Sequence, residues 1–354
     1  MNRFARIITV LSRFAQDGCG SAAAYSRRAM SVVGTVAEIW RYPVKSMTGE
    51  RLAQSAVSTR GLHADRMWAV RDVERDTFTT ARRWPVLLQC GARFVADPAG
   101  RSAEPGEVLE VVITLPDGSE ISSSDPAVHD RLSELVGKPA RLESLPALSA
   151  KRRYRTPQAT KADIRRQWDL SNDEPLPDFS MFPIRKLAEL ARYATPVGAL
   201  YDAYPIHLVT RASLRAMSEL SPGSQFDVRR FRPNVVVDCD GSELVEFDWC
   251  GGRLRAPNVA FDAEIPTLRC SIPTRPHGDL PVDPLVLRTI NAHADHCLGV
   301  YADVVTAGTL VEGDPLELEP PVSASAPVAA ARSGAMALKR STLRVVDALM
   351  PRGK

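Results

Sequence analysis

Short β-rich segments separated by turn residues are the feature that most constrains the fold of this chain. The clearest signal lies at residues 109–124, LEVVITLPDGSEISSS, where Asp117-Gly118 separates two β-rich segments. An Asp-Gly pair accommodates the positive φ angles of a tight turn, so this segment predicts a β-hairpin. Residues 34–42, GTVAEIWRY, and residues 67–82, MWAVRDVERDTFTTAR, have the same strand composition. The chain is therefore predicted to be mainly β with short helices, in the α+β class.

Helix signals in the sequence are short and local. Thr210 is suited to cap a helix over residues 211–220, because its hydroxyl can accept a hydrogen bond from a free amide of the first turn. Asp283 is suited to cap a second helix. The expected inner face of the first helix consists of Leu214, Met217 and Leu220.

A chain of 354 residues is long enough for two domains. A basic and then acidic, Pro-containing stretch separates the two β-rich parts, and a Pro/Ala/Ser-rich tail follows the second. The predicted organisation is an N-terminal tail over 1–33, a first domain over 34–145, a connecting segment over 146–195, a second domain over 196–319 and a C-terminal tail over 320–354.

The first 29 residues hold five arginines and one acidic residue. This composition is typical of an organellar transit peptide. The alternative is that Met30 is the natural start. The sequence therefore predicts a cytoplasmic protein, or a mitochondrial one if residues 1–29 act as a transit peptide.

Bulk composition excludes several classes of protein. The net charge of +3 is too small to indicate a nucleic-acid partner, and no apolar run is long enough for a membrane span. Six cysteines are scattered along the chain, which predicts free thiols in a reducing compartment.

Three polar motifs adjoin predicted strands. Lys45 and Ser46 follow a strand end, where a cation and a hydroxyl could bind an anion, or could be ordinary turn residues. Arg66 follows Asp65, which suits either a structural ion pair or a ligand clamp. The third motif, RPN, places Arg232 and Asn234 around a rigid proline, before an apolar strand.

Cys270 directly follows an arginine, a neighbour that favours the thiolate form that binds metals or attacks electrophiles. A lone cysteine is also a common small buried residue. A third hypothesis is a structural zinc site that combines Cys270 with His293, His296 and Cys297.

The order of these motifs resembles the MOSC family, specifically proteins in which an N-terminal β-barrel domain precedes the MOSC domain. The resemblance extends over residues 34–318 and includes the mitochondrial amidoxime-reducing components. It rests on the motifs YPVKS, DRMW, TAR, FRPN, RC and GDP, in that order.

The resemblance implies two β-barrel-like domains with a molybdenum-pterin cofactor between them, ligated by one cysteine, here Cys270. It also implies a set of cofactor-binding residues: Lys45, Ser46, Arg66, Thr210, Arg232 and Asn234. The implied activity is reduction of N-hydroxylated compounds such as amidoximes, hydroxylamines and N-hydroxy bases. The sequence has no Cys-x₄-Cys-x₂-Cys spacing for an iron-sulfur cluster, so electrons are expected from a separate flavin, haem or iron-sulfur protein.

One departure from the family leaves the substrate open. The reductases often have a second cysteine three residues before the metal ligand, and this chain has Thr267 there. An alternative function is a non-catalytic carrier of the cofactor, or of sulfur held as a persulfide on Cys270.

Overall fold

The computed structural model of the chain describes residues 30–157, 159–172, 174, 176–241 and 243–321. The basic segment 1–29 and the tail 322–354, on which predictions were made, lie outside the described residues. In the described part of the chain, no helix has the length and apolar character needed to cross a membrane.

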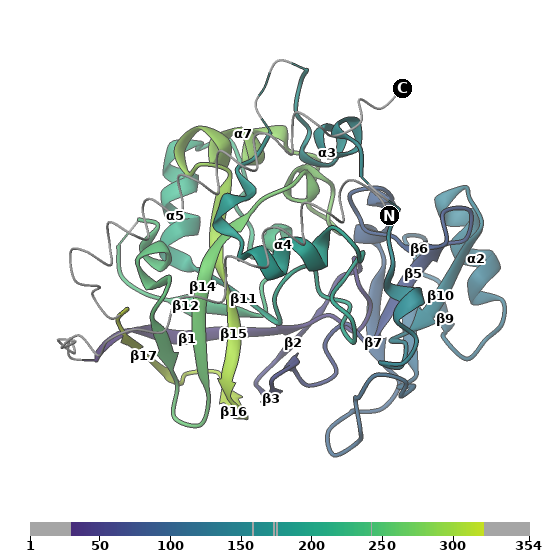
Figure 1. Cartoon of the computed structure of the whole chain (residues 1–354), viewed down its shortest axis with the longest axis horizontal. Coiled ribbons are helices and arrows are strands. Elements are labelled where there is room, and N and C mark those ends of the chain that lie inside the picture. The colour runs from purple at the N-terminus through teal and green to yellow at the C-terminus, as the bar shows by residue number, and fades with distance from the viewer. Residues whose placement is uncertain (1–29, 158, 173, 175, 242, 322–354) are drawn as a thin grey trace.

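A closed seven-stranded β-barrel forms the larger part of the molecule (Figure 1). Its strands pair in the order β12–β11–β15–β14–β13–β17–β1, and β1 pairs again with β12 to close the ring. Their bounds are β1 (Ser31–Arg41), β11 (Ile206–Thr210), β12 (Val235–Asp238), β13 (Arg253–Arg255), β14 (Ala260–Leu268), β15 (Cys297–Thr306) and β17 (Pro315–Glu319).

The barrel interior is apolar because alternate residues of each strand point inward. In β14, every second side chain is buried, which is the period that a half-buried strand requires. The inward residues form one continuous cluster that includes Ile39, Leu208, Val237, Phe261 and Val300. Each of these five side chains is completely buried. This packed core makes the barrel a rigid support for the loops at its end.

The N-terminal part consists of small antiparallel sheets. One sheet has the order β10–β5–β6, a second β7–β8–β9 and a third β16–β3–β4, while β2 extends the barrel sheet beside β1. Their bounds are β2 (Glu50–Leu52), β3 (Gln54–Ser58), β4 (Gly61–Leu62), β5 (Trp68–Asp72), β6 (Thr77–Phe78), β7 (Gly91–Phe94), β8 (Val111–Thr114), β9 (Glu120–Ser122), β10 (Ala140–Ser144) and β16 (Gly308–Val311). Pairing among the described strands closes one ring, built from β1 and strands of residues 206–319. Of the two expected barrels, this one is present, and the strand pairing of the described N-terminal sheets does not close a second.

The predicted hairpin at residues 109–124 is confirmed. Strands β8 and β9 pair across it, and Gly118 has a φ of 82° in the turn. The helix α2 (Val128–Val136) follows and ends at Gly137, whose φ is 68°. A large apolar cluster holds these elements together and includes Ile113 and Leu132.

Strand pairing joins the N-terminal part to the barrel. Strand β1 belongs to the barrel although it lies at the N-terminal end of the chain, and β3 pairs with β16 from the C-terminal end. Figure 1 shows β1 crossing the molecule along one edge of the barrel toward the N-terminal sheets. The domain boundaries near 145 and 196 stay a prediction.

Helices α5 (Arg211–Leu220), α6 (Val228–Phe231) and α7 (Pro284–His293) cover one side of the barrel. Thr210 and Asp283 cap α5 and α7 as predicted, by accepting hydrogen bonds from Ser213 N and Leu285 N. Met217 is buried in the cluster between these helices. The prediction for Leu220 is wrong: it is 49% exposed, because α5 ends there and turns toward solvent.

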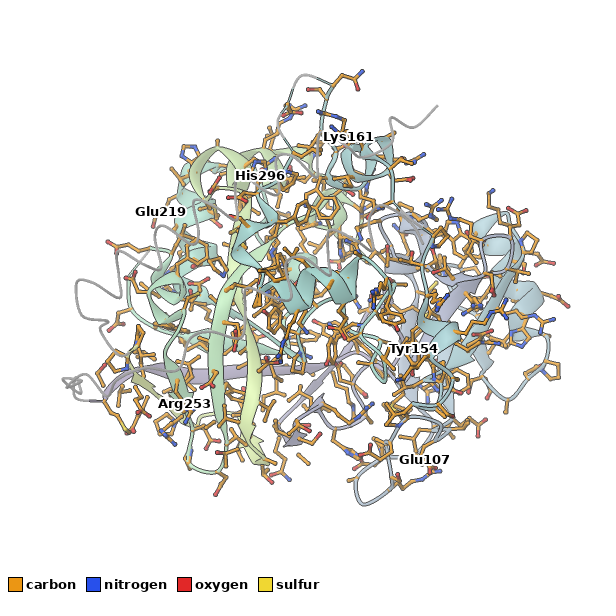
Figure 2. The ribbon with its side chains drawn as sticks, viewed as in Figure 1. Glu107, Tyr154, Lys161, Glu219, Arg253 and His296 are labelled. Carbon is orange, nitrogen blue, oxygen red and sulfur yellow. The ribbon has the colours of Figure 1, made fainter. Side chains whose placement is uncertain are left out.

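The connecting segment folds over the junction between the two parts. It contains the short helices η2 (Lys151–Tyr154), α3 (Lys161–Trp168), η3 (Phe179–Met181) and α4 (Ile184–Leu190), while η1 (Pro85–Gln89), η4 (Val245–Trp249) and η5 (Ile272–Thr274) lie elsewhere. Tyr154, labelled in Figure 2, is fully buried in the N-terminal core and donates a hydrogen bond to Pro146 O. This segment is therefore fixed in place at its start.

Candidate functional site

A cavity of about 1850 Å³ lies where the N-terminal sheets, the connecting segment and the end of the barrel meet. Six of the seven predicted site residues line it: Lys45, Ser46, Arg66, Arg232, Asn234 and Cys270. These residues come from positions up to 225 apart in the sequence, and only the tertiary fold brings them together.

Lys45 and Ser46 lie in the loop after β1. Lys45 is 4% exposed, and its ammonium donates hydrogen bonds to Leu200 O at 2.8 Å and to the Asp202 carboxylate. Ser46 has a φ of 72°, and its hydroxyl accepts a hydrogen bond from Ala81 N at 2.9 Å. The loop is thus held in one conformation from both sides.

Arg66 packs against a buried tyrosine, Tyr42, that lies behind the cavity-lining residues. Its guanidinium pairs with Asp65 and lies 4.8 Å from the centre of the Tyr42 ring. The Asp65 carboxylate also accepts a hydrogen bond from Tyr42 N at 2.8 Å. The predicted Asp65–Arg66 ion pair is present, and Arg66 lines the cavity as well.

Arg232 lies on the same Tyr42 ring, with its guanidinium carbon 4.4 Å from the ring centre. Its Nη1 donates to Met47 O at 2.6 Å, whereas its buried Nη2 has no hydrogen-bond partner in the part of the chain that the structure describes. Burial lowers the pKa of Arg232 to about 10, so it remains a cation at neutral pH. A buried guanidinium nitrogen without an acceptor is costly and suits an anionic ligand.

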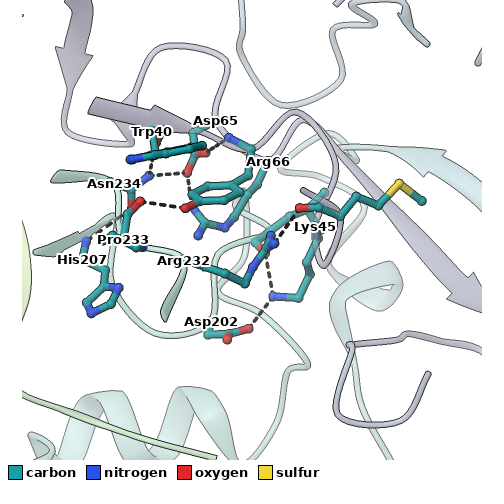
Figure 3. A network of polar contacts seen from close by, with 12 residues as sticks. Trp40, Lys45, Asp65, Arg66, Asp202, His207, Arg232, Pro233 and Asn234 are labelled. Atoms are coloured by element: carbon teal, nitrogen blue, oxygen red, sulfur yellow. Dashed lines mark hydrogen bonds and ion pairs between the residues drawn. The ribbon is translucent and has the colours of Figure 1, made fainter. Parts of the chain in front are cut away.

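Asn234 organises the wall behind these cations. Its Nδ2 donates to Asp65 Oδ2 at 3.1 Å and to Trp40 O at 3.3 Å, and its Oδ1 accepts from His207 N at 3.3 Å. Figure 3 shows this amide between His207, which belongs to β11, and the Asp65 carboxylate. Both the oxygen and the nitrogen of the amide therefore have hydrogen-bond partners within the protein. The Asn234 side chain thereby helps to fix the position of Asp65.

Cys270 follows the end of β14 and lines the cavity as a half-buried free thiol. The neighbouring Arg269 donates to Leu298 O at 2.8 Å, to Phe231 O at 3.2 Å and to His207 Nε2 at 2.5 Å. Burial and the charge of Arg269 lower the pKa of His207, so His207 is neutral and can accept this hydrogen bond. Arg269 thereby anchors the end of β14, and its predicted effect on the thiol stays a prediction.

Thr210 lies outside this cavity. It is fully buried at the start of α5, and its hydroxyl donates to Glu246 Oε2 at 2.8 Å. The predicted helix cap at Thr210 is confirmed, whereas its proposed contact with a cofactor gains no support from its position.

The structure adds functional candidates that sequence reasoning missed. Arg82 and Asp202 line the cavity, and Arg82 Nη2 lies 3.9 Å from Asp202 Oδ1. Trp168 and Tyr301 also line it. Burial disfavours the ionised form of Asp202, but the charges of Lys45 and Arg82 outweigh it and hold its pKa below the usual range. Arg82 belongs to the TAR motif, so the sequence contained a signal that could have identified it. No sequence motif pointed to Asp202 or Trp168.

The predicted zinc site is not assembled. Among the described residues, no group of three or more His, Cys, Asp or Glu side chains is placed to hold a metal ion. His293 is exposed at the end of α7, whereas Cys297 is buried in β15, where burial raises the pKa of its thiol to about 12. Cys270, His293, His296 and Cys297 therefore do not form a zinc site.

Two protein-family models match parts of this chain. Residues 33–130 match the MOSC N-terminal beta barrel domain, and residues 197–317 match the MOSC domain. The chain therefore belongs to the MOSC-domain proteins that also carry this N-terminal domain.

Among curated proteins, the chain is similar to mitochondrial amidoxime reducing component 2 of Rattus norvegicus. The two are 25% identical over 314 residues, which cover 82% of this chain and 85% of the rat protein. The human mitochondrial amidoxime-reducing component 1 is 28% identical over 60% of this chain and 59% of its own. A molybdenum cofactor sulfurase of Drosophila grimshawi is 25% identical over 70% of this chain, which spans 29% of that protein.

A solved structure, the YUAD protein from Bacillus subtilis, aligns over 84% of this chain and 99% of its own length. Its sequence identity is 11% and its TM-score is 0.39, which is too low to support an argument.

Proposed function

We propose that this protein is a molybdenum-cofactor-dependent oxidoreductase that reduces N-hydroxylated compounds with electrons from a separate partner protein. The observation that carries this proposal is the cavity, which combines a free thiol, Cys270, with the cations Lys45, Arg66 and Arg232. The relatives named as amidoxime reducing components support the reaction class.

The residues of the cavity fit the chemistry of such a cofactor. A molybdenum pterin is anionic, and Lys45, Arg66 and Arg232 would hold its negative groups, with the unpartnered Nη2 of Arg232 as a free donor. Ser46 would add a hydroxyl, and the thiolate of Cys270 is a soft ligand that suits molybdenum. The donor set therefore matches the group that the family implies.

When bound, the cofactor would supply the two-electron chemistry that removes oxygen from the substrate. The residues of this chain would orient it. The Tyr42 ring supports two guanidinium groups, and the ionised Asp202 keeps Lys45 in place. The sequence has no cluster-binding cysteine spacing, so a flavin, haem or iron-sulfur protein would deliver the electrons.

The test is to purify the protein from a host that makes the molybdenum cofactor and to measure molybdenum, released pterin and benzamidoxime reduction with an artificial electron donor. We expect stoichiometric molybdenum and pterin in the wild type. Cys270→Ala should lose all reduction and part of its molybdenum. The control is Cys239→Ala, which removes a half-buried free thiol outside the cavity. Full activity in Cys270→Ala, or absence of pterin from the wild type, would contradict the proposal.

A second candidate function is a carrier that holds the cofactor or transfers sulfur through a persulfide on Cys270. The similarity to a molybdenum cofactor sulfurase over 70% of this chain favours it. A carrier should release its cofactor to a cofactor-free molybdenum enzyme and should not reduce benzamidoxime. Turnover of benzamidoxime with retention of the cofactor would reject this alternative.

A further inference from the structure

The connecting segment builds an aromatic wall in the cavity that also contains Cys270. Trp168, the last residue of α3, packs edge to face on Phe179, with ring centres 5.6 Å apart and planes at 85°. Both rings line the cavity. The buried indole nitrogen of Trp168 has no hydrogen-bond partner among the residues that the structure describes. A buried indole N–H usually has a hydrogen-bond partner within the protein, so an unpartnered one that faces a cavity indicates a ligand.

A main-chain hydrogen bond positions this wall beside the thiol. Ser271 N, next to Cys270, donates to the carbonyl of Gln167 at 3.0 Å, and Gln167 precedes Trp168. The other end of α3 is held by a capping box, in which Thr160 and Asp163 exchange hydrogen bonds. The main chain at the end of α3, which carries Trp168, is therefore hydrogen-bonded to the loop that carries Cys270.

Arg82 adds a cation to the same wall. Its guanidinium carbon lies 5.7 Å from the centre of the Trp168 ring, and its Nη2 lies 3.9 Å from Asp202. Burial opposes the charged form of Arg82, but Asp202 outweighs this and raises its pKa, so the cation persists. An apolar planar surface next to a cation and a free N–H donor suits a flat aromatic group with a polar substituent.

We propose that Trp168 and Phe179 form an aryl-binding subsite, so that the enzyme prefers N-hydroxylated substrates with an aromatic ring next to the reacting group. This inference rests on the proposed function and specifies its substrate class. In this subsite, the ring of the substrate packs on the aromatic wall, and the indole N–H donates to a polar atom of the substrate. Aliphatic N-hydroxylated compounds lack the contact area that the wall offers.

The first test measures binding without turnover. Benzamidoxime and acetamidoxime, its aliphatic counterpart, are titrated into the purified protein by calorimetry without an electron donor, so that no reduction occurs. Both compounds are uncharged at neutral pH, and their oxime group offers an acceptor for the indole N–H. We expect Trp168→Ala to weaken benzamidoxime binding by at least about tenfold, because it removes one wall of the subsite. Trp168→Phe, which keeps a ring, should lose less. The control is Trp249→Phe, which changes a tryptophan in the barrel core outside the cavity.

The second test compares substrates in the molybdenum-loaded enzyme. Trp168→Ala should raise KM for benzamidoxime by about tenfold, with little change in kcat or in the kinetics of acetamidoxime. Molybdenum content and Tm of each variant check that the fold and the cofactor are retained. Equal losses for both amidoximes, or unchanged benzamidoxime binding in Trp168→Ala, would overturn the inference. Benzamidoxime binding that depends on Trp168, without reduction of either amidoxime when electrons are supplied, would support the subsite and reject the proposed function.

Discussion

Three residues of the cavity have a left-handed backbone conformation although none is glycine. The φ angles of Ser46, Arg66 and Arg232 are 72°, 53° and 53°. Such conformations cost about 1–3 kcal/mol each in side-chain-bearing residues and persist where the surrounding structure imposes them. Here the surrounding hydrogen bonds do so, including Arg66 N to Tyr42 O at 2.7 Å. The strain therefore serves to direct all three side chains into one cavity.

Arg232 should contribute most to retention of an anionic cofactor, because its Nη2 lacks a partner in the described protein. We expect Arg232→Gln to weaken cofactor retention by about ten- to a hundredfold, since a charge-assisted hydrogen bond contributes about 1.5–3 kcal/mol. Pterin and molybdenum content after gel filtration measure the effect. Arg288→Gln, an exposed arginine on α7, is the control and should retain both. Unchanged content in Arg232→Gln would reject this role.

A buried histidine near the site should make stability depend on pH. Burial lowers the pKa of His277 to about 4, from about 6.5 in the unfolded chain. Below about pH 6.5 the unfolded chain binds a proton at this position and the native protein does not. The contribution of His277 is therefore fully present above pH 6.5 and is lost as the pH falls toward 4.

Urea unfolding at several pH values between about 7 and 5 measures this dependence. His277→Gln should reduce the slope of the unfolding free energy by up to about 1.4 kcal/mol per pH unit, which is the effect of one proton. His293→Gln, which changes an exposed histidine on α7, is the control variant for the substitution itself. Identical slopes in wild type and His277→Gln would show that His277 titrates alike in both states.

At the scale of elements, β15 reaches the site only because Gly299 allows close packing against β11. Gly299 has a φ of 78°, and a Cβ there would lie 2.4 Å from Leu208 O and 2.7 Å from His207 Nε2. The glycine thus lets His207 approach β15 and accept the hydrogen bond of Arg269. The anchoring of the Cys270 loop depends on this contact between two strands.

Gly299→Ala should therefore destabilise the fold by more than about 3 kcal/mol, since steric overlap adds to the cost of positive φ. The control is Gly118→Ala, because Gly118 has a φ of 82° and a Cβ there meets no atom within 4 Å. It should cost only about 1 kcal/mol. Chemical denaturation of both variants gives the two values. Equal losses would show that the close contact in β15 does not contribute.

At the scale of the whole molecule, the cavity joins parts of the chain that have separate apolar cores. The N-terminal core and the barrel core are distinct clusters, and the connecting segment spans the cavity between them. A ligand in this cavity contacts residues from both parts and from the connection. Its binding free energy should therefore stabilise the whole fold.

The proposed function predicts a difference in stability between protein with and without the cofactor. Protein from a host that cannot make the molybdenum cofactor should have a Tm at least about 5 °C below that of the loaded protein. It should also be cleaved faster by trypsin at the exposed basic residues Lys151, Arg152, Arg153 and Arg155 of the connection. Calorimetry and timed digestion measure both effects. Equal Tm and equal cleavage rates would show that the cavity does not hold a tightly bound cofactor.

The sequence by itself determined the short-range features of this protein. The hairpin at Asp117-Gly118, the caps at Thr210 and Asp283 and the ordered polar motifs depend on residues a few positions apart, whose preferences act within one turn. The tertiary structure alone decided that β1 closes the barrel, that Asp202 and Trp168 line the cavity and that Thr210 does not. These outcomes depend on the packing of segments up to 287 residues apart, such as Ser31 beside Leu318, and no local preference encodes such packing.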